Sequence, residues 1–215
     1  MKKGVGAVAL CATLFVLANV RATCVEAFFS PNDKPTGKLL ELIISARRSI
    51  FVAVYFLTDQ TIAEALVAAH KRRIDIKIVI DPITAQSRCG KADFLACHGI
   101  EIYVFRPGSK AGGGDNKWAG QPLMHDKYAV FDNDYVWTGS FNWTVTACMS
   151  NCENVVLIKD HVLCARYKQN FETLLTRCVR YDSAEWHKQQ AQRNNVEAEP
   201  GERAVVAQPV PAAAA

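Results

Sequence analysis

Short apolar segments rich in β-branched and aromatic residues alternate with helical patterns in the first half of the chain. Residues 49–56 (SIFVAVYF), 75–80 (DIKIVI) and 100–105 (IEIYVF) have the length and composition of buried strands. Between them, the spacing of apolar residues predicts helices that end near His70 and His98. Because strands and helices alternate, we predict an α/β fold with a layered sheet.

Further elements extend this pattern towards both ends of one domain. A hairpin is predicted around the turn at residues 132–134. A closing helix is expected over residues 161–180, with apolar side chains such as Val162 and Phe171 turned inward. The other expected elements are strands at 25–29, 128–131, 135–138 and 153–158 and a helix that ends near Arg48.

An apolar leader precedes the domain and a polar tail follows it. Lys2 and Lys3 come before an uncharged run over residues 4–20, a pattern typical of an export signal. The run is also near the length that spans a bilayer, so an uncleaved membrane anchor is the alternative. Export would place the protein in the periplasm or outside the cell. These features predict a signal peptide or anchor at 1–22, a folded domain at 23–182 and a disordered tail at 183–215.

The formal net charge of +4 does not by itself indicate a nucleic-acid-binding surface. Three basic residues belong to the leader, and the tail after Asp182 has three basic and four acidic residues. The part between residues 23 and 182 therefore has 19 basic and 17 acidic residues, a difference of +2. Affinity for an anionic partner must come from a local site.

Cysteine usage agrees with export. Beyond the leader, the chain has seven cysteines, enough for one or more disulfides in an oxidising compartment. Seven is odd, so at least one thiol stays free or pairs between chains, and the spacing leaves the connectivity open. No metal is predicted, because the Cys148–Cys152 pair has no matching pair at zinc-site spacing. The seven are Cys24, Cys89, Cys97, Cys148, Cys152, Cys164 and Cys178.

Polar residues at fixed short offsets cluster in the second half of the chain. The pattern is His125-x-Lys127-x4-Asp132-x6-Gly139-Ser140-x-Asn142, and Glu153 opens the next predicted strand. On a strand, His125 and Lys127 point to the same face, whereas Asp126 points away. The pattern therefore predicts one pocket that holds both an imidazole and an ammonium group.

These residue types suit the chemistry of a phosphodiester. An imidazole is a nucleophile, and Lys127 supplies a positive charge and three donors for non-bridging phosphate oxygens. Ser140 and Asn142, again two residues apart, add neutral donors. Fixed donors of this kind stabilise the charge that develops in the transition state, and they need no metal or other cofactor.

The pattern resembles the HKD motif of the phospholipase D superfamily, together with Met124 before the histidine and the run from Thr138 to Thr144 (TGSFNWT). The resemblance covers residues 25–180. It is to the short members with one motif per chain, bacterial periplasmic endonucleases and the mitochondrial cardiolipin hydrolase/Zucchini group. It implies a layered sandwich, a central mixed β-sheet flanked by helices, with the catalytic domain at 23–182.

The resemblance also implies roles for the motif residues. His125 would attack phosphorus to form a phosphohistidine, while Lys127, Ser140 and Asn142 bind the phosphate. Glu153 would orient the imidazole and balance its charge. Two motif positions are expected to be structural: Asp132, which would fix the hairpin, and Gly139.

The family mechanism uses a histidine from a second motif, which this chain lacks. The other four histidines have no lysine two residues later. We therefore expect a homodimer in which both copies share one active site at the interface. The most favoured function is an exported endonuclease that cleaves DNA or RNA. Two alternatives remain open, a hydrolase of phospholipids such as cardiolipin and a non-catalytic phosphate-binding module.

Overall fold

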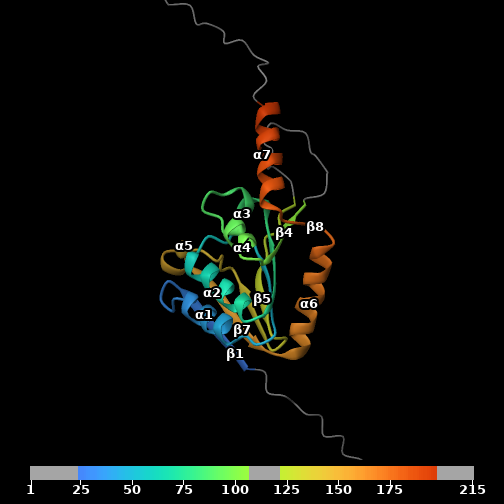
Figure 1. Ribbon diagram of the computed structural model, residues 1–215. Coiled ribbons are helices and arrows are strands. Elements are labelled where there is room, and N and C mark those ends of the chain that lie inside the picture. The colour runs from blue at the N-terminus through green and yellow to red at the C-terminus, as the bar shows by residue number, and fades with distance from the viewer. Residues whose placement is uncertain (1–23, 107–121, 198–215) are drawn as a thin grey trace, which may run out of the picture.

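The computed structural model describes residues 24–106 and 122–197. Within these ranges, strands form one eight-stranded mixed sheet with helices on both faces (Figure 1). The helices α1 to α5 lie on one face and α6 lies on the other, as Figure 1 shows. The predicted α/β sandwich with a central mixed sheet is therefore confirmed.

The strands lie close to their predicted positions. The strands are β1 (Cys24–Ser30), β2 (Ser49–Val54), β3 (Asp75–Ile80), β4 (Glu101–Phe105), β5 (Lys127–Phe131), β6 (Tyr135–Gly139), β7 (Glu153–Lys159) and β8 (Cys178–Arg180). The helices are α1 (Thr36–Ser45), α2 (Gln60–Lys71), α3 (Pro82–Gln86), α4 (Ala92–Cys97), α5 (Val145–Met149), α6 (His161–Leu175) and α7 (Ser183–Glu197).

The strand order is β1-β7-β6-β5-β2-β3-β4-β8, in which only the neighbouring pairs β2–β3 and β3–β4 are parallel. Because β5 is antiparallel to β2 and β6 is antiparallel to β5, the starts of β5 and β7 lie beside the ends of β2, β3 and β6. We call this end of the sheet the motif end. The opposite end, where the turn between β5 and β6 lies, is the hairpin end.

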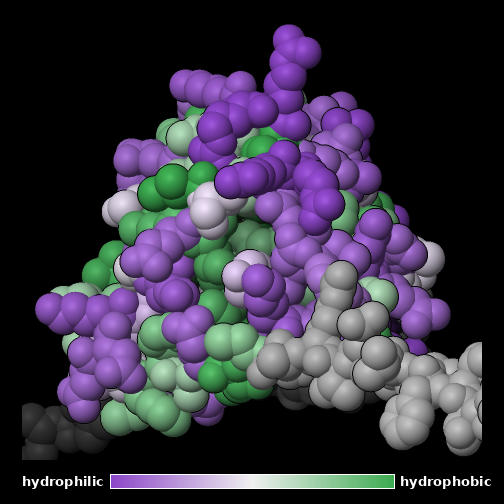
Figure 2. Space-filling view, turned by 90° about the horizontal axis from the view of Figure 1, so that it is seen from below, coloured by the Kyte–Doolittle hydropathy of each residue, from purple (hydrophilic) through white to green (hydrophobic). Residues whose placement is uncertain are grey.

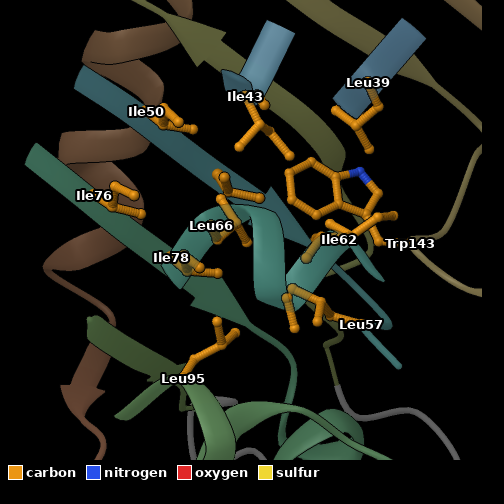
Figure 3. Packing of buried hydrophobic residues seen from close by; sticks show 14 of the residues in the cluster. Leu39, Ile43, Ile50, Leu57, Ile62, Leu66, Ile76, Ile78, Leu95 and Trp143 are labelled. Atoms are coloured by element: carbon orange, nitrogen blue, oxygen red, sulfur yellow. The ribbon is translucent and has the colours of Figure 1, made fainter. Parts of the chain in front are cut away.

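The larger core fills the space between the sheet and helices α1, α2 and α4. Leu39 and Ile43 of α1 pack with Ile50 of β2 and with the indole of Trp143, and all four are fully buried (Figure 3). A smaller cluster, which includes Phe51 and Phe171, lies under α6. Both sheet faces are covered here, so β2 is buried from Ile50 to Val54 and β3 is buried over its last three residues, in agreement with their apolar sequences.

The end of the chain differs from its prediction. The expected helix over 161–180 stops at Leu175, and β8 then pairs with β4. Val162 is 81% exposed rather than turned inward. The tail predicted to be disordered from residue 183 begins with helix α7, because Trp186 packs on the core and stacks near Tyr181.

The predictions for the cysteines can be compared with the structure, whereas those for the leader cannot. All seven cysteines from Cys24 to Cys178 are free in the structure, so the predicted disulfides do not form there. The leader at 1–22, the glycine-rich segment after Arg106 and the tail beyond Glu197 lie outside the described residues. No helix within the described ranges is long and apolar enough to cross a membrane.

Candidate functional site

The motif histidine and lysine lie at the motif end, where β5 begins. Lys127 is the first residue of β5, and His125 precedes the strand. The backbone N–H of Tyr55 donates to the carbonyl of Asp126 at 2.8 Å, which extends the pairing of β2 with β5 past Lys127. This bond holds the segment around His125 in line with the strand.

Lys127 is buried, although its charged group lies at a pocket. Its Nζ donates to the backbone oxygen of His125 at 2.6 Å and lies 5.1 Å from the centre of the Tyr55 ring. Burial lowers the pKa of Lys127, while the negative charges of Asp126 and Glu153 act in the opposite direction. An ammonium group held this way has few competing partners and is available to an anionic ligand.

The His125 side chain is exposed and packs on an aromatic ring. Its imidazole centre lies 4.5 Å from the centre of the Tyr55 ring, with a tilt of 60° between the planes. The imidazole therefore faces the pocket with one side supported, as a nucleophile requires.

Asp81 holds the backbone just before His125, and this residue was not identified from the sequence. Its carboxylate is 3% exposed and accepts from the N–H of Met124 and of Ile83, each at 3.0 Å. Burial raises the pKa of Asp81, opposed by these two bonds and by the nearby His125. A signal was present in the sequence, since Asp81 directly follows a buried strand, before the proline that starts α3.

The loop after β6 is fixed by two buried aromatic residues. Phe141 and Trp143 have no exposed surface, so Ser140 and Asn142, which alternate with them, turn towards the motif end. The side-chain oxygen of Asn142 is buried and has no hydrogen-bond partner within the described residues. This oxygen is an acceptor, as the oxygens of a phosphate are, so the predicted role in phosphate binding would use the amide NH₂ group of Asn142 instead.

Gly139 begins this loop at a point where the backbone passes very close to β7. A Cβ atom added to Gly139 would lie 2.1 Å from the carbonyl oxygen of Asn154, and the φ angle of +157° is one that side chains disfavour. The position therefore requires glycine, in agreement with its predicted structural role.

Glu153 has partners that differ from the prediction. One oxygen accepts from the Ser140 hydroxyl at 2.5 Å, and the other accepts from the side-chain amide of Asn151 at 3.0 Å. Among the described residues, it makes no hydrogen bond to His125. The Ser140 hydroxyl also accepts from the N–H of Asn154 at 3.0 Å, so its proton is committed to Glu153 rather than free for phosphate.

Asp132 lies at the hairpin end, away from His125 and Lys127. Its carboxylate accepts from the backbone N–H groups of Arg47, Arg48 and Ser49 at 2.6–2.9 Å. These bonds join the hairpin to the start of β2. The contacts of Asp132 are therefore structural. Its carboxylate fixes both the hairpin and the connection that precedes β2.

An open pocket of about 560 Å³ is lined by both His125 and Lys127. It runs from His125 and Lys127 across Thr138 and Gly139 to α6. Asp126 also lines this pocket, and Tyr128, two residues later, packs under α6. Val54, the partner of Lys127 on β2, packs on the other face, so the alternation along this segment agrees with the expectation that Asp126 points away from Lys127. No group of three possible metal ligands lies together within 24–106 and 122–197.

Comparisons with known proteins agree with this geometry. Residues 39–175 match the family described as "Cardiolipin synthase, PLD-like domain". The chain is 31% identical over 165 residues to the mitochondrial cardiolipin hydrolase of Xenopus laevis, which covers 72% of each protein. It is 32% identical to a phospholipase D of Rickettsia bellii, covering 68% of this chain and 67% of that one.

A solved structure shares the whole fold. The phospholipase D family member Nuc from Salmonella typhimurium is 31% identical, with a TM-score of 0.64. The match covers 74% of this chain and 99% of the other. The similarity therefore extends over a complete domain and includes the motif end.

Proposed function

The chain belongs to the phospholipase D superfamily of hydrolases, and from this we propose that it is a metal-independent phosphodiesterase with His125 as its nucleophile. The observation that carries the proposal is the pairing at the start of β5. There, an exposed imidazole and a buried ammonium group share one pocket, and Lys127 Nζ is bound to the backbone of His125 itself.

The proposed reaction proceeds in two displacements at phosphorus. A nitrogen of His125 forms a bond to phosphorus while the bond to the leaving oxygen breaks. That oxygen takes a proton from a general acid, which is a different group from the nucleophile. Water then attacks the phosphohistidine, its proton returns to the same group, and the bond to His125 breaks. Lys127 and the Asn142 amide would hold the non-bridging oxygens, so that the developing charge meets fixed donors.

The general acid would be His125 of a second copy of the chain. The described residues contain one motif, and a two-fold axis through the motif end would bring the two histidines together in a single site. Glu153, held by Ser140 and Asn151, would then act on the charge of the pair through space. In this dimer, Glu153 would orient the imidazole of His125 in its own chain or in the second copy.

Among substrates, we favour nucleic acid and propose an exported endonuclease. The leader with Lys2 and Lys3 supports export. The pocket is lined mainly by polar side chains, which suits a nucleotide chain better than acyl groups. A lipid substrate is the second candidate, because a relative 31% identical is a cardiolipin hydrolase.

A substrate panel in EDTA tests the activity. Purified protein would be incubated with plasmid DNA, RNA and cardiolipin vesicles, and we expect cleavage of nucleic acid without added metal. Exclusive turnover of cardiolipin would favour the second candidate. If no phosphodiester is cleaved, both enzyme proposals fail, and the phosphate-binding module remains.

Mixed assemblies test the shared site. Wild-type and His125→Asn chains would be unfolded together at equal amounts and refolded, so that copies pair at random. A site that needs both histidines would retain about one quarter of the wild-type activity, whereas independent sites would retain about one half. Light scattering would show whether the active species is a dimer.

A further inference from the structure

The pocket beside the catalytic pair continues onto one flank of α6. Arg166, Gln169, Asn170 and Thr173 line it, and their spacing places them on a single stripe of the helix. All four are exposed. We call the space between this stripe and Thr138 the α6 corner. The proposed chemistry at phosphorus uses none of these side chains.

Hydrogen bonds fix the polarity that the corner presents. The hydroxyl of Tyr128, which is 3% exposed, donates to Oδ1 of Asn170 at 2.8 Å. The oxygen of this amide is therefore occupied, and its NH₂ group is the part available to a ligand. In the same way, Oε1 of Gln169 accepts from Arg166 at 3.2 Å, which leaves the Gln169 amide nitrogen as a donor.

An aromatic residue forms part of the wall. Tyr167 is half-buried, its ring meets that of Tyr128 edge to face at 4.9 Å, and its hydroxyl donates to Thr138 at 3.3 Å. The ring is thus held in place by contacts on two sides. Aromatic side chains fixed in this manner are surfaces on which nucleobases stack.

Asp126 separates the corner from the catalytic pair. Burial raises the pKa of its carboxyl group, against the opposing effect of Lys127 and His125. A carboxylate at this border disfavours a second phosphate and accepts hydrogen bonds from neutral N–H and O–H groups. Asp126 therefore favours the phosphate on the side of Lys127. Arg166 adds a positive charge to the corner, but its guanidinium donates to Gln169, and the other side chains that the stripe presents are neutral hydrogen-bonding groups.

We propose that the α6 corner binds the nucleoside next to the scissile phosphate, an inference that rests on the proposed function. A base offers a planar ring to Tyr167 and an edge of acceptors and donors to Asn170 and Asp126. A lipid fits less well, because none of the described residues that line the pocket has an aliphatic side chain. The volume of about 560 Å³ lies within the range of small-ligand sites.

The experiment compares two substrates that share the phosphodiester but not the nucleoside. Values of kcat/KM would be measured for a single-stranded oligonucleotide and for bis(4-nitrophenyl) phosphate. The variants are Asn170→Ala and Asn170→Asp, the second of which keeps the acceptor for Tyr128 and so protects the fold. Each should lose about tenfold in kcat/KM on the oligonucleotide, mainly through KM, and nothing on the small diester.

A matched control lies on the opposite flank of the same helix. Glu172 is exposed and lines a different groove, so Glu172→Ala should cleave both substrates like the wild type. Equal losses on both substrates, or no loss on the oligonucleotide, would overturn the nucleoside site while leaving the phosphodiesterase intact. Losses seen only on cardiolipin vesicles would assign the corner to a lipid headgroup instead. A wild-type protein inactive on both diesters would remove the proposed function itself.

Discussion

The two ends of β5 carry residues of one sequence motif, but these residues differ in how they are exposed and hydrogen-bonded. At the motif end, His125 is exposed, Lys127 is a buried cation, and a side-chain oxygen of Asn142 has no partner within the described residues. At the hairpin end, the carboxylate of Asp132 is fully engaged with three backbone N–H groups. The groups proposed to meet a substrate thus lie at one end of β5, and a carboxylate engaged with the backbone lies at the other.

The surface at the hairpin end is mostly polar. Figure 2 views the molecule from below, onto the end where β1 and α6 begin, and polar side chains cover most of it around a narrower apolar band. Of the exposed apolar residues, Val25 and Val162 belong to these element starts. We therefore expect substitutions at the motif end to change activity more than stability, and those at the hairpin end to do the reverse.

The largest effect is expected for His125→Asn. The asparagine lacks the nucleophile, so kcat should fall at least about 10⁴-fold. Because the side chain is exposed, the melting temperature should stay near the wild-type value. Rapid quenching with labelled substrate should trap an acid-labile phosphoenzyme in the wild type and none in the variant. Retained turnover would remove His125 from the nucleophile role.

The second-largest effect is expected for Lys127→Met. This variant should lose about 10²–10³-fold in kcat/KM, since one charged donor to the phosphate is removed. Methionine fills a similar volume without a buried charge, so stability should be unchanged or slightly higher. Thermal melting beside steady-state kinetics checks both parts. A large loss of stability would show that Lys127 is mainly structural, and the contrast between the two ends would then fail.

Asp132→Ala should reverse the pattern. Three backbone N–H groups lose their acceptor, which should lower the free energy of unfolding by about 3 kcal/mol. Folded protein below its transition should keep its kcat/KM within about twofold, because the side chain is remote from the pocket. Urea unfolding and activity at low temperature measure the two quantities. A loss of activity without a loss of stability would place Asp132 in the chemistry.

The sequence predicted the strands, and it predicted that His125 and Lys127 share one pocket, because both depend on local patterns. Apolar runs identify β2 and β3, and the period of a strand places His125 beside Lys127. The sequence marked the position of Asp81 at the end of a buried strand, but it could not reveal the bond from Met124 to Asp81 or the bond from Ser140 to Glu153, because these contacts join segments distant in the chain. It also missed α7, since a polar helix with one packed tryptophan has little apolar periodicity to detect.

The pH profile should show the lowered pKa of Lys127. Binding of the phosphate needs the charged amine, and burial favours the neutral form. As pH rises, kcat/KM should therefore decline through a pKa below the ordinary value of a lysine. Over that interval the contribution of Lys127 to the melting temperature should be a rise, because the unfolded chain holds this proton more tightly than the folded protein. Lys127→Arg should move this decline upward, because a guanidinium keeps its charge. A decline unchanged in Lys127→Arg would assign it to another group.

The smallest effect is expected from Asp134→Ala, which isolates the ion pairs of the hairpin end. Asp134 lies 3.3 Å from Arg48 and 3.3 Å from His161, but the Arg48 side chain is 68% exposed. Solvent screens such pairs, so the free energy of unfolding should change by about 0.5 kcal/mol. Asp132→Ala serves as the matched comparison, because its carboxylate accepts from three backbone N–H groups, whereas that of Asp134 pairs with charged or titratable side chains. The Asp134→Ala change should shrink further in 1 M salt, whereas that of Asp132→Ala should persist. A large, salt-independent effect of Asp134→Ala would show that charge pairing, and not satisfied backbone donors, stabilises the hairpin end.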